Sequence, residues 1–251
     1  MIGKTFWKNI SEFGDRTREI ATEIILKFVE GTIGGEHTLP TYISRPMQAG
    51  ELIDLDIDAT IEARIQNPMA TEIIPWGFER QTSRNPVLLV LDTSFSMNGE
   101  KLTIAGITVG VLSQLLPITD IAVLGFNKEP YVIKGFDEEL SKYYMINRIM
   151  NTQPRGGTNL AAAIGLAAEL IFPFHPHGRI IMLTDADPTT GKNPIPEAAK
   201  LHQLDIMLFP DGNEFVAERL AFEAYSGAYH RIRHYNDIPK IIKDIFSTQS
   251  K

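Results

Sequence analysis

The chain reads Val-Leu-Leu-Val-Leu-Asp-Thr-Ser-Phe-Ser over residues 87–96. Its first five residues form a continuous apolar run, which is typical of a strand buried on both faces of a parallel sheet. Similar runs follow later in the chain, and segments long enough for a helix separate them. This alternation predicts an α/β fold with a doubly wound, mostly parallel sheet.

The predicted elements extend from residue 87 almost to the end of the chain. Parallel strands are expected at residues 87–91, 121–126, 179–184, 206–209 and 229–232, with an antiparallel edge strand at 131–134. Helices are expected at residues 101–116, 138–150, 160–172, 196–202, 214–224 and 237–246. Residues 86–251 are therefore predicted to form the main domain.

Residues 1–85 are predicted to form a helical N-terminal extension. Apolar residues between Ile20 and Val29 form one stripe along a helix, and so short a helix is marginal in water without a surface to pack against. Between Glu51 and Gln66 the apolar residues fit both a strand and a helix, and the length of the segment favours a helix after Asp56. We expect the extension to pack on the main domain through the Ile20 to Val29 stripe.

Composition excludes several classes of protein. The 251 residues are 43% hydrophobic and 22% charged, as in an ordinary globular protein. The net charge of −7 and the lack of Lys/Arg-rich blocks argue against nucleic-acid binding. Without cysteine the chain forms no disulfide, thiolate zinc site or catalytic thiol. Because we find no signal peptide and no stretch of spanning length, we expect a cytoplasmic protein without direct membrane insertion.

Oxygen-bearing side chains follow the apolar runs at three places. In an open α/β sheet, ligands bind outside the carboxyl ends of the strands, so these side chains are expected to meet. Mg²⁺ prefers oxygen ligands in near-octahedral geometry, and two carboxylates with three hydroxyls match that preference. The sequence therefore predicts a site for Mg²⁺, with Mn²⁺ or Ca²⁺ as alternatives, whose ligands are Asp92, Ser94, Ser96, Thr158 and Asp185.

These five residues resemble the metal-ion-dependent adhesion site of von Willebrand factor A domains, in which Asp-x-Ser-x-Ser is followed by a Thr and then an Asp. The resemblance runs from about residue 86 to the end of the chain and implies that family's Rossmann-like fold. It implies that the two serines touch the metal, that the Thr contacts it directly or through water, and that the aspartates often act through water. The chain departs from the pattern at Phe95 and Ala186, where relatives often have Gly.

A second resemblance covers about residues 45–97. Residues 50–62, Gly-Glu-Leu-Ile-Asp-Leu-Asp-Ile-Asp-Ala-Thr-Ile-Glu, look like stand-alone A-domain proteins that work with AAA+ ATPases of the MoxR or magnesium-chelatase type. It implies an adaptor that is not an enzyme and whose protein partner supplies a Glu or Asp to the metal. The chain has no nucleotide-binding loop, so ATP hydrolysis would belong to the partner.

An enzymatic alternative rests on residues 185–189, Asp-Ala-Asp-Pro-Thr, which are similar to the motif of haloacid dehalogenase-type phosphoryl transferases. There Asp185 would be the nucleophile and Asp187 the acid/base of a metal-dependent hydrolase. That fold needs a Lys and further acidic residues on later strands, and little chain remains for them. We therefore predict an interaction module and keep the hydrolase as the alternative.

Overall fold

The computed structural model describes residues 15–33, 42–46, 76–80, 86–97, 99–136, 138–173 and 178–247. The chain divides into two compact units, one of residues 1–36 with 85–251 and one of His37–Arg84. In the smaller unit β1 (Tyr42–Pro46) pairs antiparallel with β2 (Trp76–Arg80). The helix predicted after Asp56 lies outside the described residues, and the domain boundary near residue 85 stays a prediction.

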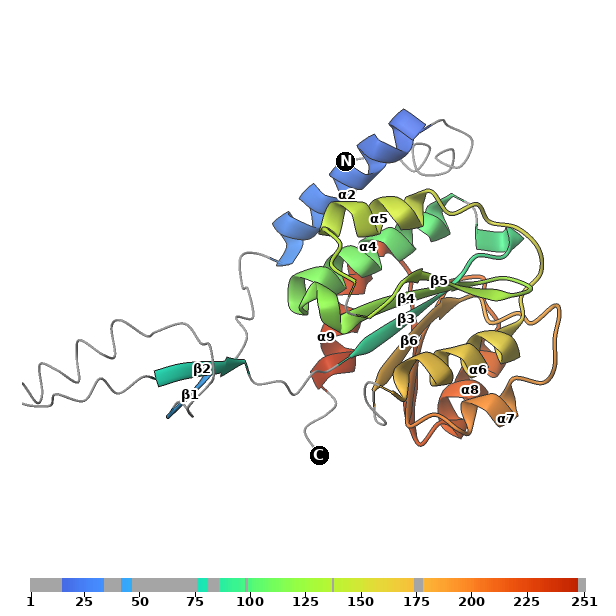
Figure 1. Ribbon diagram of the computed structural model, residues 1–251. Coiled ribbons are helices and arrows are strands. Elements are labelled where there is room, and N and C mark those ends of the chain that lie inside the picture. Colours follow the sequence, from blue (N-terminus) through green and yellow to red (C-terminus); the bar gives the residue numbers. More distant parts are fainter. Residues whose placement is uncertain are drawn as a thin grey trace, which may run out of the picture. The chain divides into compact units, whose positions relative to one another are not determined.

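A six-stranded sheet forms the centre of the larger unit, in the order β5-β4-β3-β6-β7-β8 (Figure 1). Five neighbouring strands are parallel, and β5 at one edge is antiparallel to β4. This confirms the predicted fold class. The strands are β3 (Val87–Asp92), β4 (Ile121–Phe126), β5 (Pro130–Lys134), β6 (Arg179–Thr184), β7 (Gln203–Leu208) and β8 (Ser226–Arg231).

Helices cover both faces of the sheet, which explains why β3 is a continuous apolar run (Figure 1). Leu89 points to a core shared with α2 (Asp15–Ile33), α4 (Glu100–Leu115), α5 (Lys142–Met150) and α9 (Ile238–Ser247). Leu88 points to a second core shared with α6 (Leu160–Ile171), α7 (Ile195–Ala198) and α8 (Glu214–Glu223). None of the described helices combines the length and the apolar composition that a bilayer crossing requires.

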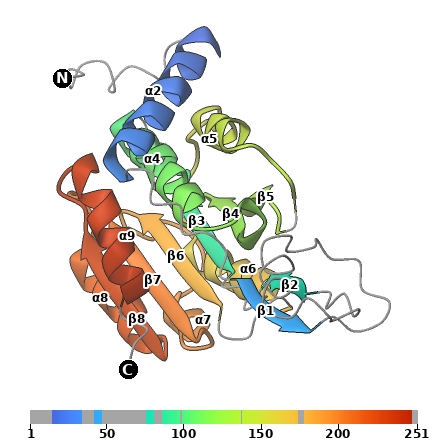
Figure 2. The same ribbon diagram turned by 90° about the vertical axis from the view of Figure 1, so that its left-hand side faces the viewer.

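Helix α2 packs on α4 and α5, as Figure 2 shows. Ala21, Ile25 and Val29 are completely or almost completely buried in this contact. A Cβ atom on Gly110 of α4 would lie only 3.0 Å from a methyl group of Val29, so the glycine permits the close approach. Ile20, which we predicted in the same stripe, is instead 45% exposed. The other members of the stripe pack on the core, with Ile24 and Phe28 partly buried, so the predicted packing through this stripe is confirmed except at its first residue.

Some helices and strands begin at other residues than predicted, because polar or small residues lie at their starts. Helix α5 begins at Lys142, not at residue 138, because the Ser141 side chain caps it by accepting a hydrogen bond from the Tyr144 backbone N–H, 3.3 Å away. Strands β7 and β8 each begin three residues before the predicted start. Polar residues, Gln203 and Asp205, interrupt the start of β7, and β8 starts with the small residues Ser226, Gly227 and Ala228, so neither start forms an apolar run. Helix α7 is a single turn.

Candidate metal site

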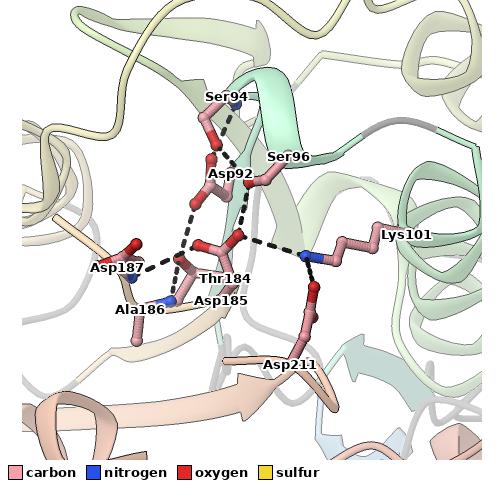
Figure 3. Close-up of polar contacts among 9 residues, drawn as sticks. All are labelled: Asp92, Ser94, Ser96, Lys101, Thr184, Asp185, Ala186, Asp187 and Asp211. Carbon is pink, nitrogen blue, oxygen red and sulfur yellow. Dashed lines mark hydrogen bonds and ion pairs between the residues drawn. The ribbon is translucent and has the colours of Figure 1, made fainter. Parts of the chain in front are cut away.

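The site lies at the carboxyl ends of two neighbouring strands. Asp92 is the last residue of β3, and Asp185 directly follows β6, its parallel neighbour. The loop after β3 turns through a short 3₁₀ helix, η2 (Phe95–Met97), so that Ser94 and Ser96 stay beside Asp92 (Figure 3). The sheet topology thus brings together side chains that are about ninety residues apart.

One series of hydrogen bonds joins four of the five predicted ligands (Figure 3). The Ser94 backbone N–H donates to Asp92 Oδ1 at 2.9 Å, and the two serine hydroxyls lie 3.1 Å apart. Ser96 Oγ in turn donates to Asp185 Oδ2 at 2.5 Å. Two carboxylates and two hydroxyls therefore converge on one small region, a donor set that suits a hard divalent cation.

Thr158 lies on an adjacent loop but is not part of this series. The loop is tied to the serine loop by two backbone bonds, from Arg155 N–H to the Thr93 carbonyl at 2.9 Å and from Phe95 N–H to the Gly156 carbonyl at 3.2 Å. Thr158 is buried, but among the described residues its hydroxyl makes no hydrogen bond to the four joined side chains. Its role as a ligand stays a prediction.

The Thr158 backbone is held from the other side by the loop after β6. Thr189 Oγ1 accepts a hydrogen bond from the Thr158 N–H at 2.8 Å, and the Thr189 N–H donates to the Thr158 carbonyl at 3.1 Å. A Cβ atom on Gly157 would lie 2.6 Å from Thr189 Oγ1. Only glycine, which has no Cβ atom, permits this approach.

Asp92 is a buried carboxyl group with a perturbed pKa. Its residue is 1% exposed, and burial raises its pKa to about 6, although hydrogen bonds from Ser94 and Thr184 act in the opposite direction. Thr184 Oγ1 donates to Asp92 Oδ2 at 2.7 Å. The ionised carboxylate is thus costly without a nearby positive charge. A cation among these oxygens would supply that charge, so the residues present fit a metal ion.

Three contacting residues were missed by sequence reasoning, namely Thr184, Lys101 and Asp211. Lys101 Nζ lies 3.3 Å from Asp185 Oδ2 and 2.9 Å from Asp211 Oδ2 (Figure 3). Thr184 was detectable as the polar end of an apolar strand. Lys101 was detectable as a basic residue one position into the helix that follows the serines. Asp211 was detectable by the same signal as Asp185, because it follows the apolar run of residues 206–209 in the loop after β7.

Asp187 and Thr189, which belong to the motif of the hydrolase alternative, do not join the hydrogen-bonded series through their side chains. Asp187 is exposed, and its contact with Asp185 is made by its backbone N–H, which donates to Asp185 Oδ1 at 3.4 Å. The Thr189 hydroxyl is engaged by the Thr158 backbone. Groups of three or more His, Cys, Asp or Glu side chains able to hold a metal are absent from the described ranges. The hydroxyl groups therefore matter for any ion bound here.

The part of the chain that contains the candidate site is similar to known proteins. Residues 87–188 match the family model of the von Willebrand factor type A domain. The mouse protein inter alpha-trypsin inhibitor, heavy chain 4, is 31% identical over 125 residues, which are 44% of this chain and 13% of the mouse protein. The chain thus spans only a small part of that relative's length.

Solved structures agree on the fold. An aerotolerance-related membrane protein from Bacteroides fragilis NCTC 9343 is 20% identical with a TM-score of 0.52, over 65% of this chain and 99% of the other. Proximal thread matrix protein 1 from the mussel byssus, solved with a zinc-occupied metal-ion-dependent adhesion site, is 16% identical with a TM-score of 0.52, over 64% of this chain and 46% of the other. Together with the sheet topology, these matches identify a von Willebrand factor type A fold in this chain, with the family match over residues 87–188.

Proposed function

We propose that this chain is a divalent-metal-dependent protein-interaction module. The observation that carries the proposal is the hydrogen-bonded series of carboxylates and hydroxyls at the ends of β3 and β6. The zinc-occupied motif of the mussel protein supports a divalent ion in this fold. Mg²⁺ is the ion we expect, with Mn²⁺ or Ca²⁺ as alternatives. The proposed ligands are Asp92, Ser94, Ser96, Thr158 and Asp185.

The donor set explains how such a site would hold a partner. By resemblance to the family, Ser94 and Ser96 touch the ion, whereas Asp92 and Asp185 often act through water. Neutral hydroxyl ligands leave the ion electrophilic, and a bound ion supplies an open position for an outside carboxylate. We therefore expect the partner protein to contribute a Glu or Asp at this position.

Two exposed side chains beside the site offer further contacts to a partner protein. Phe95 lies between the two serines in the sequence and is 71% exposed. Arg155 is also exposed, and its backbone bond to Thr93 places it next to the serine loop. Phe95 offers apolar contact area and Arg155 offers a positive charge. Both contacts would surround the partner's carboxylate.

The more specific proposal concerns the partner's identity. We infer that the chain is an adaptor for an AAA+ ATPase of the MoxR or magnesium-chelatase type, on the strength of the resemblance of residues 50–62. The sequence has no nucleotide-binding loop, so the adaptor would present a substrate or respond to the ATPase but not hydrolyse ATP.

The metal site is tested by calorimetric titration of the full chain with MgCl₂ and MnCl₂. We expect one binding event in the wild type and loss of binding in Asp92→Ala and Ser94→Ala, while circular dichroism shows that both variants stay folded. Phe95→Ala is the matched control, because it lies in the same loop without offering an oxygen. Equal binding by Asp92→Ala and the wild type would reject the site.

The partner is tested by capture from native lysate with the full chain as bait. An AAA+ ATPase, identified by mass spectrometry, should be recovered with Mg²⁺ and lost with EDTA. Thr158→Ala should weaken the complex more than Phe95→Ala, because it disturbs the ion and not only the apolar contact. A complex that forms equally well in EDTA would show that recognition occurs on another surface.

The hydrolase alternative predicts a different result. If Asp185 and Asp187 transferred phosphoryl groups, the chain with Mg²⁺ would hydrolyse a phosphate monoester such as p-nitrophenyl phosphate, and Asp187→Asn would abolish that activity. We expect no hydrolysis above the background of the Asp185→Asn variant. The exposed position of Asp187, with only its backbone touching Asp185, supports this expectation.

A further inference from the structure

A lysine occupies the edge of the proposed metal site. Lys101 lies in the first turn of α4, and its side chain is only 14% exposed. Its Nζ lies 3.3 Å from Asp185 Oδ2, the same oxygen that accepts the hydrogen bond from Ser96 (Figure 3). The ammonium group also lies 5.4 Å from the centre of the Phe209 ring, within the range of a cation–π contact. The positive charge is therefore held in place beside the oxygens.

Asp211 is a second carboxylate partner of the same ammonium group. Its Oδ2 is 2.9 Å from Lys101 Nζ, closer than the oxygen of Asp185, and its side chain is 66% exposed. The loop that carries Asp211 is tied to the site, because the Asn213 N–H donates to the Asp185 backbone carbonyl at 2.7 Å. Lys101 is thus shared between one carboxylate inside the site and one at its rim.

We propose that Lys101 competes with the metal for Asp185, and that Asp211 limits this competition by drawing the ammonium group away. The proposal rests on the metal site proposed above. A divalent ion and an ammonium group that share one carboxylate repel each other, so the lysine lowers the affinity of the site for the ion. Asp211 offsets part of that repulsion, because it offers Lys101 a second partner when an ion binds.

The charges of Lys101 and Asp211 should both change the affinity of the site for a divalent ion. Without Lys101, Asp185 would keep its full negative charge for the ion. Without Asp211, the ammonium group would pair with Asp185 alone. The two residues should therefore change metal affinity in opposite directions, and Asp211 should act mainly through Lys101. That dependence can be measured as non-additivity in a double-mutant cycle.

The test is calorimetric titration of the full chain with MnCl₂ and MgCl₂ at low salt. Lys101→Met keeps the apolar stem and should tighten binding by about tenfold. Asp211→Asn should weaken binding by about threefold in the wild type and by clearly less in the Lys101→Met background. The Asp211→Asn effect should shrink at high salt, because Asp211 is 66% exposed and screening weakens exposed charge pairs, whereas the effect of Lys101→Met should shrink less. Lys200→Met, which removes a surface lysine paired with Glu197, is the control and should change nothing.

Contrary results would distinguish failure of the proposed metal site from failure of the proposed competition by Lys101. If Asp92→Ala binds the ions as well as the wild type, the metal site itself is wrong. If Asp92→Ala loses binding but Lys101→Met binds with unchanged or weaker affinity, the site stands and the competition is overturned. Weaker binding would show that Lys101 orients Asp185 for the ion. Lys101→Gln is a second variant that must give the same direction, and thermal melting confirms that each variant is folded.

Discussion

At the scale of single residues, Ala186 shows how the backbone turns at the site. Its φ angle is 52°, the only positive φ among the described residues that are not glycine. This left-handed conformation costs roughly 1–2 kcal/mol for a residue with a Cβ atom. The Ala186 N–H donates to Thr184 Oγ1 at 2.9 Å, and the same hydroxyl donates to Asp92. The strained turn thus belongs to the network that orients the Asp92 carboxylate.

The left-handed conformation of Ala186 predicts that its substitution by glycine changes the stability of the protein very little. Ala186→Gly removes the left-handed strain but adds flexibility to the unfolded chain, so the two effects should cancel to within about 0.5 kcal/mol. Ala163→Gly, at a buried position inside α6, has no strain to relieve and should destabilise by about 1 kcal/mol or more. Urea unfolding measures both. Equal losses in the two variants would show that Ala186 is not strained in solution.

At the scale of elements, a buried charged pair links α9 to the sheet. Arg179 begins β6, and its Nη1 lies 3.7 Å from Asp205 Oδ2 on β7. The same nitrogen donates to the Ile245 carbonyl of α9, and the guanidinium lies 4.7 Å from the centre of the Phe246 ring. Burial raises the pKa of Asp205 to about 6, although Arg179 acts to lower it. The folded chain therefore binds a proton on Asp205 more tightly than the unfolded chain does.

The sign of the pH dependence follows from this raised pKa. The stabilisation from protonated Asp205 is fully present below about pH 4, the pKa of the unfolded group, and is lost as the pH rises through 6. It amounts to at most about 3 kcal/mol, from a shift of about two pKa units. The stability of the wild type relative to Asp205→Asn should therefore fall between pH 4 and pH 7 in urea unfolding. A relative stability that is flat or rises over this range would mean that Arg179 outweighs burial.

At the scale of the whole molecule, the larger unit is assembled from distant parts of the chain. Helix α2 packs on α4 and α5, although His37–Arg84, which form the other compact unit, separate it from them in the sequence. The face of α2 that packs there contributes Ala21, Ile25 and Val29 to the core. Helix α2 should thus contribute to the stability of the larger unit and not only extend it.

A pair of substitutions in α2 measures that contribution. Ile25→Ala should destabilise the full chain by about 2–4 kcal/mol, because Ile25 is 1% exposed and its removal leaves a cavity against α4. Ile20→Ala, on the same helix but 45% exposed, should cost less than about 1 kcal/mol. Thermal and urea unfolding of the two variants provide the comparison. If both behave alike, α2 is not docked in solution as the structure places it.

The features that short segments of the sequence encode were predicted correctly. The apolar runs predicted all six strands of the sheet, and Asp92, Ser94, Ser96 and Asp185 do meet at one edge. The predicted starts of helices and strands were less accurate, because capping side chains and breaks in the apolar pattern shift them. Helix α5 begins later than predicted because Ser141 caps it, and the first residues of β7 and β8 were missed because polar residues interrupt the former and small residues begin the latter. The predicted stripe of α2 packs on the core except at Ile20, because a stripe is a property of one helix and burial depends on its neighbours.

The sequence by itself determined the fold class and which oxygen-bearing residues lie at strand ends, because hydrophobic period and adjacency to a strand are properties of short segments. Only the tertiary structure decided which other polar and charged side chains meet there. Thr184 reaches Asp92 across 92 positions of the chain, and Lys101 reaches Asp185 across 84. These contacts arise because parallel strands align their carboxyl ends at one edge of the sheet, so that loops far apart in the sequence share the same few ångströms of space.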